Sequence, residues 1–357
     1  MWKKLIEWSA SEYGHLPWRK KRSLYGTLVS EIMLQQTTVS TVLNHFERFL
    51  EIYPNLKTLA VATEEEVCAN WQGLGYYRRA RNLHKAAVYL VKNHNGNFPK
   101  SIEELKLIPG IGDYTANAIV GIGCDKKALA IDANIERVVA RIHLLQKEKG
   151  PKLQKDIATR FINNELTLPF DKFSARKINE ALMDLGRVYC QARRADCHLC
   201  PVSKQCDVFK KNESPLSIPH VSADKQMKKK ESHDLSLLRV VVVSKGKILG
   251  MEREERQWLQ GQIEVPTFIL KSGDRSLKQY PKIKMPEKEF KDLPLLKTAI
   301  TKYKIKNFIL TLGRKEFQAL VRDYKGLPPY KYYNLDGQSA HFSTTTLKVL
   351  NKLSIEV

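Results

Sequence analysis

Four cysteines near the middle of the chain have the spacing of a metal site. They are Cys190, Cys197, Cys200 and Cys206, in the pattern Cys-x6-Cys-x2-Cys-x5-Cys. Four thiolates held by one short, basic loop suit either a tetrahedral zinc ion or a cubane iron–sulfur cluster. Zinc sites usually have two Cys-x2-Cys pairs, and this loop has one, so the cluster is favoured. Disulfides are the alternative, but only Cys68 and Cys124 exist besides these four, and no export signal precedes them.

The overall charge points to a negatively charged partner. The chain has 357 residues, enough for two domains, and its 60 Lys and Arg against 38 Asp and Glu leave a net charge of +22. Such an excess is typical of proteins that bind a polyanion. Nucleic acid is the first candidate and an anionic membrane the second. A basic surface without function is the remaining alternative.

The chain has no segment that predicts export or membrane insertion. Its longest apolar run is strand-sized, and the N-terminal stripe of Trp2, Leu5 and Ile6 lacks the apolar core of a signal peptide. We therefore expect a cytoplasmic protein without a membrane partner, associated with the nucleoid if the organism is a bacterium.

The pattern of apolar residues changes twice along the chain. Residues 1–206 have apolar residues at helical spacing. The helices are expected at 25–49, 63–70, 77–93, 101–107, 114–124, 131–145 and 176–190. Residues 207–234 have the composition of a linker. From 235 to 357 the pattern predicts a smaller α+β domain, with strands at 237–243, 247–251 and 308–312.

A glycine-rich turn joins two of the predicted helices. Pro109, Gly110 and Gly112 would let the backbone turn sharply and bring its N–H groups against a phosphate. A helix–hairpin–helix grips a DNA backbone in this way without reading its sequence. An ordinary turn between helices is the alternative.

The order of these features resembles the endonuclease III superfamily of DNA glycosylases. A hairpin is followed about twenty residues later by Asp132 and then by the four cysteines. Residues 30–37 (Ser-Glu-Ile-Met-Leu-Gln-Gln-Thr) and 73–84 are similar to the MutY adenine DNA glycosylases, and the likeness covers residues 1–206. It implies a mainly α region, made of a six-helix-barrel subdomain and an iron–sulfur subdomain with a [4Fe–4S] cluster at 190–206. A MutT-like (Nudix-like) α+β domain would follow. It also implies a monomer whose partner is double-stranded DNA with a mispaired adenine.

The resemblance assigns a catalytic group to four positions. Breaking a purine N-glycosidic bond requires a proton for the leaving base and support for a cationic sugar. Glu31 lies among apolar neighbours, so burial would raise its pKa and let it act as the acid. Asp132 would stay ionised beside the sugar, although it could also be a helix N-cap, and Asn134 would position it and the water. Tyr114 stands where relatives that also cut the strand have lysine, and it cannot form a Schiff base.

Further positions are expected to contact the DNA or the base. Gln36 and Tyr76 resemble the family's wedges, which fill the space left by the flipped base, with Leu34, Thr37 and Leu74 beside them. Trp18, Arg19 and Glu180 are expected to form the adenine pocket. A core position for Tyr76, and a structural ion pair for Arg19 or Glu180, are the alternatives.

The second domain departs from the family pattern. Residues 258–266 resemble a MutT-like segment, but the acidic helix that would bind magnesium is missing from the residues that follow. Ile300, Thr301 and Lys302 stand where MutY proteins have the Phe-Ser-His that recognises 8-oxoguanine. Lysine is a flexible point charge rather than a planar ring, so strict recognition of 8-oxoguanine is in doubt.

We expect a glycosylase that removes adenine opposite 8-oxoguanine, and also opposite guanine, without efficient cleavage of the strand at the abasic site. One alternative is an endonuclease III-type or mismatch glycosylase with a different base specificity. The other is a catalytically silent lesion-binding protein. The presence of both Glu31 and Asp132 argues against the silent protein.

Overall fold

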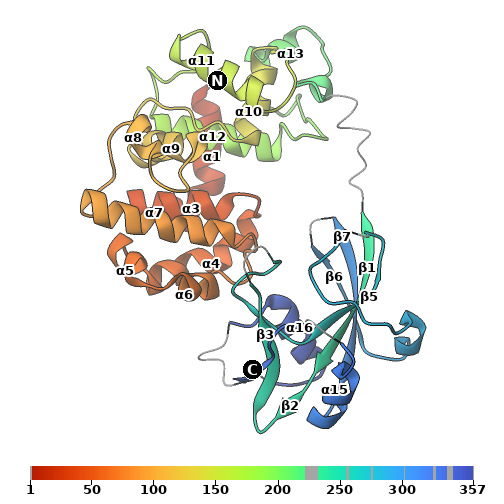
Figure 1. Cartoon of the computed structure of the whole chain (residues 1–357). Helices are drawn as coiled ribbons and strands as arrows, with labels where there is room; N and C mark the ends of the chain where they lie inside the picture. Colours follow the sequence, from red (N-terminus) through yellow and green to blue (C-terminus); the bar gives the residue numbers. More distant parts are fainter. Residues whose placement is uncertain are drawn as a thin grey trace. The chain divides into compact units, whose positions relative to one another are not determined.

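Two compact units make up the chain. The computed structural model describes residues 2–221, 232–254, 257–274, 276–300, 302–324, 327–335 and 341–356. The units are Met1–Met227 and Lys228–Val357 (Figure 1). The linker expected at 207–234 is structured at both ends, because a helix covers Asp207–Lys210 and a strand begins at His233.

The first unit is built from helices in the residues described. They are α1 (Trp2–Tyr13), α2 (Pro17–Lys20), α3 (Leu24–Leu34), α4 (Val39–Ile52), α5 (Leu56–Val61), α6 (Glu64–Asn70), α7 (Arg78–His94), α8 (Ile102–Lys106), α9 (Asp113–Ala118), η1 (Ile119–Gly123), α10 (Ala133–Ile142), α11 (Pro151–Ile162), α12 (Ala175–Val188), η2 (Ser203–Gln205), α13 (Asp207–Lys210) and η3 (Pro215–Ser217). The helical character predicted for residues 1–206 is thus confirmed.

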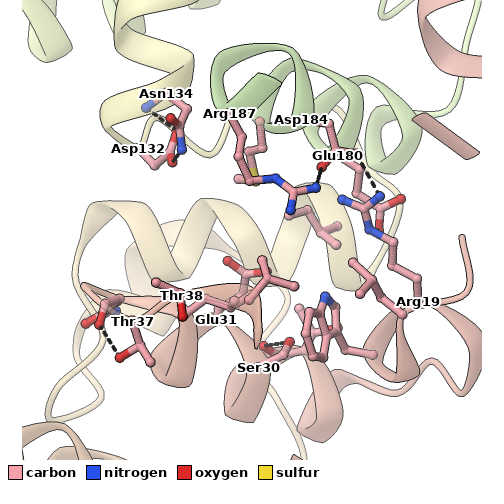
Figure 2. A pocket seen from close by; sticks show the side chains of 18 of the residues that line it. Arg19, Ser30, Glu31, Thr37, Thr38, Asp132, Asn134, Glu180, Asp184 and Arg187 are labelled. Atoms are coloured by element: carbon pink, nitrogen blue, oxygen red, sulfur yellow. Dashed lines mark hydrogen bonds and ion pairs between the residues drawn. The ribbon is translucent and has the colours of Figure 1, made fainter. Parts of the chain in front are cut away.

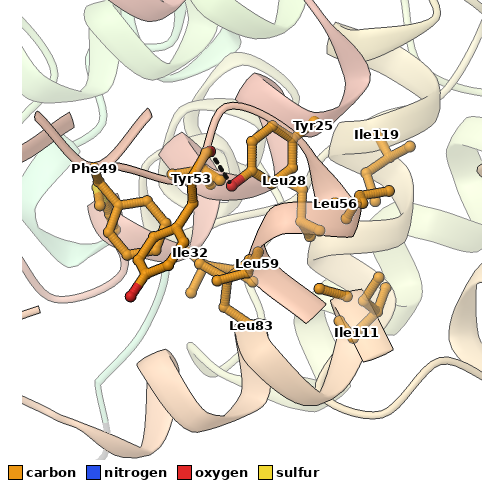
Figure 3. Packing of buried hydrophobic residues seen from close by; sticks show 14 of the residues in the cluster. Tyr25, Leu28, Ile32, Phe49, Tyr53, Leu56, Leu59, Leu83, Ile111 and Ile119 are labelled. Atoms are coloured by element: carbon orange, nitrogen blue, oxygen red, sulfur yellow. Dashed lines mark hydrogen bonds between the residues drawn. The ribbon is translucent and has the colours of Figure 1, made fainter. Parts of the chain in front are cut away.

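Helix α3 lies at the centre of this unit. Every residue from Tyr25 to Met33 is buried, as expected for a helix that packs on all sides. Ser23 begins the helix by accepting a hydrogen bond from the Gly26 backbone N–H at 2.9 Å. Figure 3 shows Tyr25 against the α4–α5 connection, where its hydroxyl donates to the Tyr53 carbonyl at 2.7 Å. Any polar side chain on this helix is therefore placed in a low-dielectric environment.

Several predicted helix boundaries are wrong. The single helix expected at 25–49 is two helices, α3 and α4, separated by residues 35–38. The break occurs because Thr38 caps α4 by accepting from the Thr41 N–H, and Gln36 adopts a left-handed backbone with φ of 56°. Helix α10 begins after Asp132 rather than at 131, since Asp132 is its N-cap. The predicted ranges do not include α1, α2, α5, α11 or α13.

A second core surrounds the cysteine loop. Leu5, Val138, Leu153 and Leu182 come from α1, α10, α11 and α12, and three of the four loop cysteines pack against them half-buried. Of the two remaining cysteines, Cys68 is half-buried and Cys124 is exposed. Cys124 lies at the surface because the π-helical turn η1 ends there.

The second unit is an α+β structure with two sheets in its described residues. Its strands are β1 (His233–Val241), β2 (Val243–Ser244), β3 (Lys247–Glu252), β4 (Ile263–Glu264), β5 (Thr267–Ser272), β6 (Leu295–Ile300), β7 (Tyr303–Thr311) and β8 (Lys331–Asn334). One sheet has the order β5-β1-β7-β6, with β1 and β7 parallel. In the other, β3 pairs with β2, β4 and β8.

Short helices accompany these sheets. They are η4 (Glu287–Phe290), α15 (Arg314–Val321) and α16 (Thr344–Lys352). Phe317 of α15 and Phe290 of η4 join Leu238, Phe268 and Phe308 of the first sheet in one core. Within the part of the chain that the structure describes, none of the helices has the length and apolar character needed to cross a bilayer.

A buried charge network links the two sheets of this unit. Arg239 donates to Glu264 at 2.8 Å, and Tyr280 donates to the other carboxylate oxygen at 2.7 Å. Arg253 is 3.5 Å from the same carboxylate, and all three charged side chains are fully buried. Glu264 therefore balances two buried cations.

We predict that Glu264→Gln destabilises the second unit by about 3 kcal/mol, because it leaves buried arginines without a counter-ion. Hydrogen exchange at the amides of β1 and β7 would measure the loss locally. The matched control is Glu287→Gln, which removes a half-buried partner of the exposed Lys306 at 3.7 Å and should cost less than about 1 kcal/mol. Equal effects of the two substitutions would contradict the prediction.

Candidate active site

A deep cavity of about 1010 Å³ opens in the first unit, between α3 and α12. Its lining comes from α2, α3, the 35–38 loop, α4, α9, η1, α10 and α12, and Figure 2 shows Glu31 and Asp132 on opposite walls. Leu16, Trp18 and Met183 add apolar surface. The cavity thus brings together acidic groups that are far apart in sequence.

Glu31 is a buried acid on α3. Its side chain is 6% exposed, and its carboxylate accepts a hydrogen bond from the Tyr114 hydroxyl. Burial raises the pKa of Glu31 to about 7, the Tyr114 hydrogen bond opposes this rise, and the nearby Asp132 charge adds to it. Near neutral pH a large fraction of this carboxyl group therefore carries a proton. Tyr114 contacts Glu31 directly, and the charges of both Glu31 and Asp132 act on it, so its pKa is raised well above its ordinary value by burial and by these two charges.

Asp132 is held by hydrogen bonds. Its carboxylate accepts from the backbone N–H groups of Asn134 and Ile135 at 2.9 and 2.7 Å, and from the Asn134 side chain at 2.8 Å. Burial raises the pKa of Asp132 as well, but these three donors and the Arg137 cation oppose the rise. The two carboxyl groups thus differ mainly in their hydrogen bonds. The N-cap role is present, together with a position in the cavity.

The α12 wall carries a row of charged residues. Glu180, Asp184 and Arg187 share one face because they are spaced by about one helical turn. Arg22 makes two hydrogen bonds to Glu180, at 2.7 and 3.2 Å, and Arg19 bonds Asp184 at 2.8 Å. Arg19 and Glu180 are therefore in ion pairs, which was the alternative interpretation. Their contact with adenine stays a prediction.

Arg22 and Asp184 were not predicted to belong to the site, because little in the sequence distinguishes them from surface residues. Arg22 is an arginine in a basic run near the N-terminus, and Asp184 differs from other surface-type acids only by following Glu180 at the helical interval of four.

Two loops carry the predicted DNA wedges. Gln36 is exposed, and it lines the cavity together with Leu34 and Thr37. Tyr76 is 60% exposed, so the core position that was its alternative is wrong. Leu74 was expected to lie beside the wedges and contact DNA, but its side chain is buried in the core of the first unit.

The helix–hairpin–helix joins α8 to α9 and is exposed at Pro109, Gly110 and Gly112. Gly110 has a φ of 83°, and a Cβ atom there would lie 2.6 Å from the Asn82 Cβ, so this turn requires glycine. In the second unit, Ile300 ends β6. Lys302 lies before β7, 3.1 Å from Asp274, while Thr301 lies outside the described residues.

The cysteine loop is connected to the cavity. All six cysteines are described, and none of them forms a disulfide. Arg137 donates to the Cys190 carbonyl at 2.7 Å and to the Asn134 side-chain oxygen at 2.9 Å. Arg141 donates to the Cys190 Sγ at 3.2 Å. In the described ranges no group of His, Cys, Asp or Glu side chains is arranged to hold a single metal ion. The donor set of four sulfurs with an arginine on one of them fits an iron–sulfur cluster.

Comparison with known proteins shows which proteins the first unit resembles. Residues 29–163 match the family described as HhH-GPD superfamily base excision DNA repair protein. The adenine DNA glycosylase of Buchnera aphidicola subsp. Baizongia pistaciae is 35% identical over 202 residues, which cover 56% of this chain and 55% of the relative. That of Rattus norvegicus is 35% identical over 215 residues, covering 57% and 40%. The chain thus spans about half the length of these curated relatives.

Among solved structures, a thermostable thymine-DNA glycosylase is 25% identical with a TM-score of 0.49, covering 58% of this chain and 94% of that one. Residues 29–163 thus match the HhH-GPD base excision DNA repair family, and the first unit is similar to adenine DNA glycosylases.

Proposed function

We propose that this protein excises adenine mispaired with 8-oxoguanine, and also with guanine, from double-stranded DNA. The observation that carries the proposal is the cavity in which a buried Glu31, with its pKa raised to about 7, faces Asp132. An acid and an anion on opposite sides of a nucleotide-sized space are the two groups that N-glycosidic bond hydrolysis needs. The adenine DNA glycosylases among the relatives support adenine as the base.

The proposed reaction begins with the flipped adenine in the cavity. Glu31 in its acid form gives its proton to N7, the C1′–N9 bond breaks, and the bonding electrons stay with N9 of the leaving base. The Asp132 carboxylate stabilises the positive sugar. A water molecule, held near Asn134, then adds at C1′, and its proton goes to the Glu31 carboxylate, which restores the acid.

Tyr114 supports a reaction without strand cleavage. Cleavage at the abasic site would need an amine that forms a Schiff base with the sugar, and a phenol cannot do so. The hydroxyl of Tyr114 instead donates to Glu31 and keeps the carboxyl group oriented. Trp18, Arg19 and Glu180 would hold the adenine, with Arg22 fixing the Glu180 carboxylate.

The four cysteines would hold a [4Fe–4S] cluster, and we propose that its role is to order the loop so that the loop's cationic side chains can contact phosphate. Arg137 and Arg141 would tie that loop to α10, and Arg193 and Arg194 would face phosphate. The second unit would be a MutT-like lesion-recognition domain, with Ile300, Thr301 and Lys302 near the opposite base and without magnesium-dependent hydrolysis.

A row of lysines in the second unit supports a DNA partner. Lys271, Ser236, Lys306 and Lys297 lie directly opposite one another across β5, β1, β7 and β6. All three lysines are exposed, and Lys297 faces Lys306 although like charges across strands are destabilising. Lys297 and Lys306 line a groove of about 520 Å³ with Lys288, Lys291 and one acidic residue, Glu287, which lies 3.7 Å from Lys306. A bound phosphate backbone would neutralise this repulsion.

The first test uses duplexes with adenine opposite 8-oxoguanine, guanine or cytosine, and thymine opposite guanine. We expect breaks in the adenine strand, opposite 8-oxoguanine and guanine, that require alkali. Glu31→Gln should lower the single-turnover rate by about 10²- to 10⁴-fold, because it removes the general acid, while DNA affinity is retained. Breaks without alkali would indicate a lyase. Tight binding without any breaks would leave only the lesion-binding protein.

The rate should also depend on pH through Glu31. Since the proposed mechanism needs the protonated carboxyl group, the single-turnover rate should be constant well below pH 7 and fall about tenfold per pH unit well above it. The residual rate of Glu31→Gln should lack this decline, because the amide does not titrate. A wild-type rate that rises with pH across the same range would contradict the acid role.

Removing the opposed lysines should weaken DNA binding in a salt-dependent way. For Lys297→Ala with Lys306→Ala we expect the slope of log affinity against log salt to become shallower by about 2, one unit per lost phosphate contact. The matched control, Lys247→Ala with Lys331→Ala, removes two exposed lysines from the other sheet. The groove is excluded as a DNA contact if both pairs change the slope equally or not at all.

A further inference from the structure

The two wedge loops share an unusual backbone feature. Gln36 has a φ of 56° and Tyr76 a φ of 48°, both in the left-handed region that residues other than glycine rarely adopt. Both side chains are exposed. Each such backbone conformation costs of the order of 1 kcal/mol, and it persists only where surrounding contacts hold it.

One buried arginine makes contacts to both loops. The Arg79 side chain is 8% exposed, and six oxygen atoms accept hydrogen bonds from its two terminal nitrogens. On the first loop and the end of α3 these are the carbonyls of Ile32, Met33 and Gln35 and the hydroxyl of Thr37, the last at 2.9 Å. On the second they are the carbonyls of Leu74 and Gly75, at 3.0 and 3.2 Å.

The same guanidinium also contacts the wedge side chain of the second loop. It lies 5.6 Å from the ring centre of Tyr76 and 5.6 Å from that of Trp71. The Trp71 indole N–H donates to the Gly75 carbonyl at 3.2 Å. The exposed Tyr76 ring is therefore supported by a buried cation, which is in turn held by a buried indole.

The chemistry of this position requires arginine. The last carbonyls of α3 have no partners within the helix, and the negative end of the helix dipole favours a cation there. A guanidinium presents five N–H donors in a rigid plane, so it can reach oxygens on two loops at once. A lysine ammonium has three donors at a single point, and it would leave carbonyls of one loop unsatisfied.

We propose that Arg79 is a positioning residue that holds Gln36 and Tyr76 in their left-handed conformations before DNA binds. Both side chains are then oriented to enter the duplex as the adenine leaves it. This inference rests on the proposed function. The inference adds that one side chain, which lies outside the catalytic cavity, preorganises both wedges.

The test compares Arg79→Lys with its parent, in the Glu31→Gln background, on a duplex with 2-aminopurine in place of the target adenine. Fluorescence reports extrusion of the base independently of catalysis. We expect the lysine variant to extrude the base about 10²-fold less readily, the scale of loss for a group misplaced by about 1 Å. Its affinity for a duplex with a tetrahydrofuran abasic analogue opposite 8-oxoguanine should stay close to that of the parent, because no base has to be extruded.

Two further measurements separate positioning from folding. Without DNA, hydrogen exchange at residues 35–38 and 73–77 should be faster in Arg79→Lys than in the parent. It should be unchanged in the control Arg81→Lys, which alters another arginine of α7 and keeps a cation near Glu64 of α6. Thr37→Val removes one of the six hydrogen bonds, and it should lower extrusion by several-fold even if the lysine variant folds poorly.

Normal extrusion in these variants would overturn the inference, as would an equal loss of affinity for both duplexes. A wild-type chain that releases no adenine from any duplex would instead overturn the proposed function.

Discussion

The burial of Glu31 on an entirely packed helix is the constraint on which the rest of the first unit depends. Burial disfavours the ionised form of a carboxyl group in that position and raises its pKa to about 7. The same burial that costs free energy therefore makes Glu31 a proton donor near neutral pH. The neighbouring elements follow from this requirement. Helix α9 brings the Tyr114 hydroxyl to the carboxyl group, and the start of α10 presents Asp132 across the cavity. The two carboxyl groups differ because one is a helix N-cap with three donors and the other receives a single hydrogen bond.

The fold could be predicted from the sequence where a local pattern decides it. Helical spacing identified most helices of the first unit, and the change to strand-like runs identified the α+β unit. The break between α3 and α4 could not be predicted from apolar spacing, because the spacing continues across residues 35–38. It depends on Thr38 as a cap and on the left-handed backbone of Gln36, whose cost is offset by hydrogen bonds from Arg79 to the neighbouring Gln35 and Thr37.

The same distinction holds for the site. The four cysteines could be proposed from their spacing, and Glu31 and Asp132 from the resemblance of the segments around them to a known family. Arg22, Asp184 and Arg79 could not, since their importance lies in partners that only the fold brings near. In a chain with 60 basic residues, an arginine that binds five backbone carbonyls is not distinguishable by type from one on the surface.

Buried arginines of the first unit connect segments that are distant in sequence. These connections explain how separate parts of the site keep their relative positions. Arg79 joins the two wedge loops, Arg137 joins the Cys190 carbonyl to Asn134, and Asn134 in turn holds Asp132. Each of these two buried planar cations also bonds carbonyls at the end of a helix: Arg79 bonds those of Ile32 and Met33 in α3, and Arg137 bonds that of Gly186 in α12. Loss of such a group would leave several acceptors unsatisfied at once, so its effect would spread to both elements that it joins. The geometry of the cavity is therefore coupled to the cysteine loop on one side and to the wedge loops on the other, through side chains that themselves do no chemistry.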